Sequence, residues 1–217
     1  MRQQRWLIRE DPMVMLDYLQ GVASERKLRL ASAAICRLIW AHLRSKRSRA
    51  AIEAAEMYAD GRIDKKTMLR AGKSAQAARR ARGFQSFASA ARDVALGAGA
   101  AYSAHLVLGA VANALGRDRA SPAQCTIFFD VFGNPFRPLT IAPALLSWND
   151  GTIIKLAQLA YDERILPAGT LDNTRLLILA DALEEAGCTD KQILTHLLSG
   201  GEHYRGCWVF DALLGRS

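Results

Sequence analysis

Apolar residues recur every three or four positions along most of the chain, which predicts amphipathic helices. The longest such segment follows Ser24, a residue type that favours the N-cap, and runs to about Arg44. Its apolar positions share one arc of a helical projection, and its arginines lie on the opposite arc. No stretch alternates apolar and polar residues over the length of a strand. The pattern predicts an all-α fold, an irregular multi-helix bundle.

Residues that favour helix ends mark the other helices. Asp11, Ser48 and Asp64 predict N-caps, and Ser121 followed by Pro122 predicts another helix start. In the last third, a helix over 175–186 ends at Gly187, and Thr189 with Gln192 fits a capping box. A last short helix is expected over 203–214.

One long segment, 132–138, is irregular, because two prolines, a glycine and an asparagine fall within a few residues. Such a rigid loop can hold a partner through Phe132, Asn134, Phe136 and Arg137. The alternative is structural: the phenylalanines anchor the loop in the core, and Arg137 pairs with a carboxylate.

The segment 94–115 contains no Asp, Glu, Lys or Arg, and it is long enough to span a bilayer. It is rich in Ala and Gly and contains His105 and Asn113, so we expect a buried or loosely packed helix and no membrane partner. His105 is expected in the core. We take 93–120 as a connection between an N-terminal block, 1–92, and a C-terminal block, 121–217, that pack as one unit.

Charge separates the two parts of the chain. The whole chain has a net charge of +8. Residues 1–120 carry 22 Lys and Arg against 10 Asp and Glu, whereas residues 121–217 carry 7 against 11. A basic part favours an anionic partner such as nucleic acid. The alternatives are that the charges form a solvated face or that the two parts attract each other.

The basic residues of the predicted long helix and the segment after it are the candidate anion-binding set. Arginines with a tryptophan suit phosphate neutralisation and base stacking, but equally a cation–π pair on one helix. The set comprises Arg26, Arg29, Arg37, Trp40, Arg44, Lys46, Arg47 and Arg49. It contains no motif for sequence-specific readout.

Four nitrogen and sulfur ligands near the C-terminus form the candidate metal site: Cys188, His196, His203 and Cys207. Zinc prefers four such ligands in a tetrahedron, although this spacing matches no standard finger. His203 and Cys207 are four residues apart and would share a helical face. The alternative is that the cysteines are small core residues and the histidines lie at the surface or at caps. No other cofactor is expected.

Catalytic motifs such as a P-loop or G-x-S-x-G are missing from the sequence. Asp181, Glu184 and Glu185 are close together, but carboxylates on an amphipathic helix usually form its solvated face. We therefore do not expect an enzyme. The four cysteines form no C-x-x-C pair, which favours reduced thiols in the cytoplasm.

Several longer sequence segments are distinctive. They begin at Asp11 (DPMVML), Ala23 (ASERKLRL), Asp130 (DVFGNPFR), Ile178 (ILADALEEAGC) and Arg205 (RGCWV). With these segments the chain resembles a large paralogous family of planctomycete bacteria that has an Ala-rich middle of varying length. The family often has paired cysteines near Cys36 and a cysteine directly after His196, where this chain has Ile35 and Leu197. No activity is established for that family, so the resemblance implies no site residue.

Together these patterns predict a non-enzymatic binding or adaptor protein that acts through protein–protein contacts. The alternative is a nucleic-acid-associated protein that uses the basic N-terminal helices.

Overall fold

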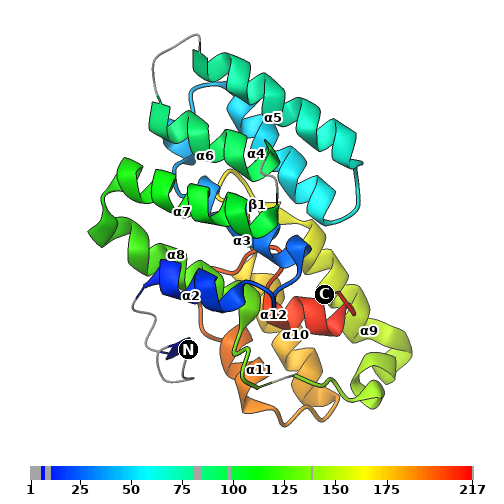
Figure 1. Cartoon of the computed structure of the whole chain (residues 1–217). Helices are drawn as coiled ribbons and strands as arrows, with labels where there is room; N and C mark the ends of the chain where they lie inside the picture. Colours follow the sequence, from blue (N-terminus) through cyan, green and yellow to red (C-terminus); the bar gives the residue numbers. More distant parts are fainter. Residues whose placement is uncertain (1–5, 8–10, 81–84, 97–98, 138, 217) are drawn as a thin grey trace. The chain divides into compact units, whose positions relative to one another are not determined.

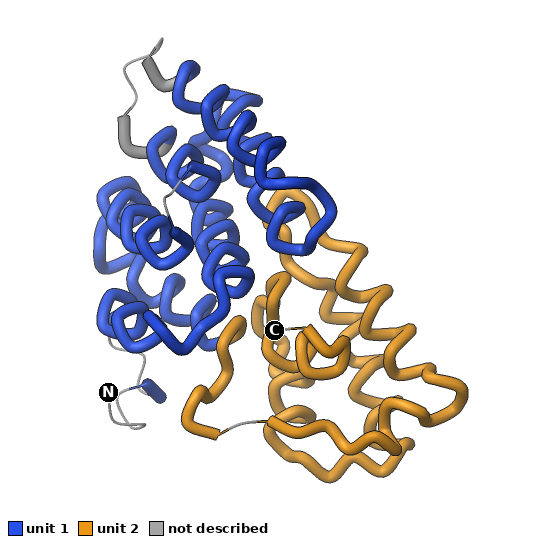
Figure 2. Tube along the Cα trace, turned by 45° about the vertical axis from the view of Figure 1, so that its right-hand side comes forward, with its two compact units in different colours: residues 1–129 blue, residues 130–217 orange. Residues whose placement is uncertain are grey.

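The computed structural model describes residues 6–7, 11–80, 85–96, 99–137 and 139–216 (Figure 1). The chain divides into two compact units, residues 1–129 and 130–217, which Figure 2 colours separately. Helices form nearly all the regular structure of the described residues, with a single two-stranded sheet, so the all-α prediction is confirmed. The division lies C-terminal to the 93–120 segment, whose described residues belong to the first unit.

The first unit is built from helices whose starts follow the predicted caps at Asp11, Ser24 and Asp64. Each of these side chains accepts a hydrogen bond from a backbone N–H in the first turn of its helix. The helices are α2 (Pro12–Leu19), α3 (Glu25–Arg37), the 3-10 helix η1 (Trp40–His42), α4 (Lys46–Ala59), α5 (Lys65–Arg80), α6 (Gln85–Leu96), α7 (Ala100–Leu115) and most of α8 (Arg117–Phe132).

The predicted long helix is wrong at its C-terminal end. Helix α3 ends at Arg37, and the N–H groups of Leu38 and Ile39 then bond carbonyls three residues back. The buried side chains of Ile39 and Leu43 continue the apolar pattern beyond the helix, which is why the pattern did not show the break. The next helix begins at Lys46, before Ser48.

The uncharged 94–115 segment spans parts of two helices, α6 and α7. Helix α7 packs against α2, α3 and α6 through a face that includes Ala104, Val107 and Val111. His105 is exposed on the other face, so its expected place in the core is wrong. In the described part of the chain, no helix combines the length and the apolar character needed to cross a membrane.

Helix α8 starts earlier than predicted. It begins at Arg117 and carries Pro122 within its second turn, so Ser121 is not its N-cap. Its last residues, from Asp130, belong to the second unit. The loop after α8 is irregular as predicted.

The second unit contains α9 (Pro143–Asp162), β1 (Arg164–Ile165), β2 (Thr170–Leu171), α10 (Asn173–Glu185), α11 (Lys191–Leu197) and α12 (Trp208–Leu213). Helix α9 is broken at residues 148–151, where Asn149, Asp150 and Gly151 have positive φ. The core lies between α9, α10 and α12 and includes Tyr161 and Phe210.

The last third of the chain departs from prediction in small elements. Strands β1 and β2 pair antiparallel, and two-residue strands are too short to give an alternating pattern. Asp190 caps α11 in place of Thr189, because its carboxylate accepts from the Gln192 N–H at 2.8 Å. The last helix begins only at Trp208.

Candidate metal centre

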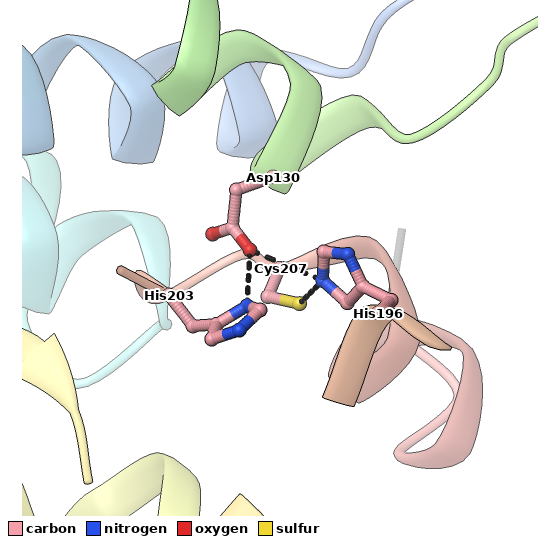
Figure 3. Close-up of side chains that lie close together, drawn as sticks. All are labelled: Asp130, His196, His203 and Cys207. Carbon is pink, nitrogen blue, oxygen red and sulfur yellow. Dashed lines mark hydrogen bonds and ion pairs between the residues drawn. The ribbon is translucent and has the colours of Figure 1, made fainter. Parts of the chain in front are cut away.

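Four side chains from three places in the second unit meet at one point. Asp130 lies in the last turn of α8, His196 in the last turn of α11, and His203 and Cys207 in the segment between α11 and α12. One ligand atom from each lies within 4.8 Å of the other three. Figure 3 shows the four side chains directed toward a common centre.

The segment that supplies His203 and Cys207 is held by backbone contacts to β2. The Leu171 N–H donates to the His203 carbonyl at 2.8 Å, and Tyr204 forms a bridge with Thr170. Gly206 has φ +87°, and the Cys207 N–H bonds the Tyr204 carbonyl, so the chain turns tightly here. The expected helical spacing of His203 and Cys207 is therefore wrong, but a turn brings them together.

Asp130 is the hub of the cluster. Its Oδ1 lies 2.8 Å from His203 Nδ1 and 3.2 Å from His196 Nε2. Its Oδ2 accepts a hydrogen bond of 2.8 Å from the Tyr204 N–H. The backbone therefore fixes one carboxylate oxygen and leaves the other facing both imidazoles.

The cysteine completes the cluster through His196, whose Nε2 lies 3.1 Å from Cys207 Sγ. The two imidazole rings meet edge to face with centroids 4.6 Å apart. Ser199 Oγ lies 3.4 Å from Nε2 of His203, on the ring nitrogen that does not face Asp130. Asp130, His203 and Cys207 are all buried, and His196 is partly buried.

Burial and hydrogen bonding set the protonation of the two acidic ligands. Burial alone raises the pKa of Asp130, but hydrogen bonds from His196 and His203 outweigh it and hold that pKa below its ordinary value. Burial, with the nearby Asp130 carboxylate, raises the pKa of the Cys207 thiol well above its ordinary value. Since Cys207 is also fully buried, it does not suit the role of a reactive nucleophile.

The donor set fits a tetrahedral metal ion. Zinc bonds of about 2.0–2.3 Å place neighbouring donor atoms about 3.3–3.6 Å apart. Three of the donor pairs, all involving His196 or Asp130, are separated by 2.8–3.2 Å, and all four donor atoms lie within 4.8 Å of one another. A divalent ion with one carboxylate, one thiolate and two neutral imidazoles has no net charge, which suits a buried site. The cluster could therefore hold a metal ion.

Three of the four predicted ligands are brought together, and Cys188 is not one of them. Cys188 is buried in the apolar core of the second unit, and its N–H donates to the Leu183 carbonyl. Asp130 takes the fourth position, and the sequence analysis did not propose it as a ligand. The available signal was its place two residues before the Phe132–Arg137 loop, as the first residue of the distinctive segment DVFGNPFR.

The Phe132–Arg137 loop packs beside this centre. Gly133 has φ +61°, and a Cβ there would lie 2.7 Å from Cγ of Trp208. The Trp208 ring lies 5.1 Å from that of His196. Asn134 Oδ1 accepts from the Phe136 N–H, while Arg137 is exposed. The lack of a side chain at Gly133 therefore lets the loop pack closely against Trp208, whose ring in turn contacts His196.

Two of the predicted anion-binding arginines are inside the first unit. Arg29 donates to the Val94 carbonyl at 2.9 Å, and Arg37 forms two hydrogen bonds of 2.7 and 2.8 Å with Glu56. Both are 5% exposed, so the expectation that they face outward is wrong. Trp40 stacks on Arg37 and Arg49, with guanidinium-to-centroid distances of 4.6 and 5.6 Å, which is the cation–π alternative.

The remaining basic candidates differ in their surroundings. Arg26 pairs with Asp60 at 3.2 Å and is partly buried, as is Arg49. Arg44, Lys46 and Arg47 are exposed. The acidic side chains of α10 that were considered for catalysis, Asp181, Glu184 and Glu185, are exposed, as a solvated face requires.

Comparison with protein-family models, with curated proteins and with solved structures found no match. The resemblance to the planctomycete family therefore stays a prediction.

Proposed function

We propose that this chain is a non-enzymatic binding protein whose second unit is organised by a structural zinc ion. The ligands are Asp130, His196, His203 and Cys207. The observation that carries the proposal is the meeting of four ligand atoms within 4.8 Å in a buried position. Structural zinc sites use four protein ligands and leave no position open for substrate.

The chemistry of the ligands favours zinc. A thiolate with two imidazoles suits zinc and other late transition metals, whereas magnesium and calcium prefer oxygen ligands. The contacts from Tyr204 N–H to Asp130 and from Ser199 to His203 would orient two ligands before the ion arrives. Zinc would supply a cross-link between α8, α11 and the start of α12, and no chemical step.

A protein partner is the proposed target of binding. What supports it is the number of large apolar side chains that the second unit leaves in solvent. They include Ile165 in β1, Leu166 directly after it, and Leu177 and Ile178 on α10, each between 47% and 64% exposed. The four cysteines are all free thiols, which supports a reducing compartment such as the cytoplasm.

Metal analysis of the purified full chain tests the zinc proposal. We expect about one equivalent of zinc per chain, as a single four-ligand site requires. Cys207→Ser should lose it, and Cys188→Ser is the matched control, since Cys188 is also buried in the second unit but lies outside the cluster. Retention of zinc by the Cys207 variant, or a chelator-treated chain that neither rebinds zinc nor changes its circular dichroism, contradicts the proposal.

A further inference from the structure

Helix α5 carries a concentration of positive charge that the packing of the first unit does not explain. Its 16 residues, Lys65–Arg80, include six Lys and Arg and no Asp or Glu. Lys65, Lys66, Arg70 and Lys73 are exposed. Helix α5 is drawn in cyan in Figure 1.

Three of these cations share one face. Lys66, Arg70 and Lys73 are spaced by four and three residues, so they follow each other along the helix over about 10 Å. The other face is packed inside the first unit. Met68 and Ala75 are buried in a core cluster with residues of α4 and α6, and a Cβ on Gly72 would lie 2.6 Å from Leu96 Cγ. The cationic face is therefore fixed outward.

This arrangement does not favour the stability of the helix. Lys65 and Lys66 lie at the N-terminus, where the helix dipole disfavours positive charge. The pairs Lys66–Arg70 and Arg70–Lys73 place like charges at neighbouring positions, which also disfavours the helix. Within the described residues, the side chains of Lys66 and Lys73 have no hydrogen bond or ion pair, and that of Arg70 has only a charge interaction with Asp64.

The structural division coincides with the separation of charge along the chain. The first unit, residues 1–129, carries 22 Lys and Arg against 10 Asp and Glu, and the second unit carries 7 against 11. Arg29 and Arg37 are buried and accounted for by internal contacts. The cations of α5, in contrast, are among the exposed basic residues of this unit.

We propose that the face of α5 formed by Lys66, Arg70 and Lys73 binds the phosphate backbone of nucleic acid without regard to sequence. Among the described side chains of α5, Thr67 and Ala77 are the exposed uncharged neighbours of these cations. The large apolar neighbour, Leu69, is packed against the core cluster, so the described face offers charge and no fully exposed aromatic or large apolar anchor for a protein. A membrane-surface helix would need its apolar face for the lipid, and that face is already buried. Phosphates need only cations.

The test measures binding of the full chain to a labelled DNA duplex from 50 to 200 mM salt. The variant carries Lys66→Gln, Arg70→Gln and Lys73→Gln, which preserve helix propensity. The matched control carries Arg117→Gln, Arg119→Gln and Lys155→Gln, three exposed cations that belong to other helices. Both variants have the same net charge, and circular dichroism checks that both fold.

The α5 variant should bind at least about tenfold more weakly at 50 mM salt. Its log–log salt slope should be smaller by about 2.7, because each phosphate contact contributes about 0.9. The control should stay within about twofold of the original chain. Equal losses in both variants overturn the proposal, because general charge then explains the binding. Absence of binding at 50 mM salt, or binding to phosphatidylserine vesicles without binding to DNA, overturns it as well.

Discussion

His203 Nδ1 lies 2.8 Å from Asp130 Oδ1, although 73 residues separate the two in the chain. The contact joins the last turn of α8 to the segment before α12. A metal ion would bind here only in the folded chain, because the ligands do not meet in the unfolded one, so its binding would stabilise the fold.

Asp130→Asn should weaken zinc binding by about tenfold or more, because it removes the only carboxylate of the ligand set while keeping its size. A competition titration against a chromogenic chelator measures the change. Asp181→Asn, on the exposed face of α10, is the control and should leave the affinity as it is. An unchanged affinity in the Asp130 variant would remove it from the ligand set.

Gly133→Ala should destabilise the second unit by about 1–3 kcal/mol, because the residue has φ +61° and its new Cβ would meet the Trp208 ring. Denaturant unfolding followed by circular dichroism measures this. Gly109→Ala is the comparison, since Gly109 lies within α7 with nothing near its Cβ position. Alanine there should be neutral or stabilising. Equal effects at the two glycines would rule out the contact with Trp208 as the cause.

Glu56→Gln should cost about 3–5 kcal/mol of the free energy of unfolding, because it leaves the buried Arg37 guanidinium without its carboxylate. Glu53→Gln, on the exposed side of the same helix, should change it by about 0.5 kcal/mol or less. Urea unfolding of the full chain separates the two. A small effect at Glu56 would mean that Arg37 finds another acceptor.

Asp64→Ala should weaken α5, because Asp64 Oδ1 accepts the Thr67 N–H at 2.8 Å. Hydrogen bonds to Thr67 lower the pKa of Asp64, so the charged carboxylate favours the folded state. Its contribution is present above the ordinary carboxyl pKa and is lost as pH falls through the lowered one.

Hydrogen exchange of the first turn of α5 as a function of pH measures that contribution. Protection factors, which remove the intrinsic pH dependence of exchange, should fall more in acid in the original chain than in the Asp64→Ala variant, which has no carboxylate to protonate. Parallel pH profiles in the two proteins would contradict this role of Asp64.

The amino-acid sequence alone determined the helical class, three of the helix starts and the separation of charge. Periodicity and caps act over one or two turns, so Asp11, Ser24 and Asp64 could be recognised from their neighbours. The charge difference between the units needs only counting.

Only the tertiary structure decided which side chains meet. It replaced Cys188 by Asp130 in the candidate metal centre and placed Arg29 and Arg37 inside the first unit. Arg37 and Glu56, which form a buried pair, are 19 residues apart in the sequence, and Asp130 and His203 are 73 residues apart. No local pattern records contacts at such separations, because they arise from the packing of whole helices and the turns that join them.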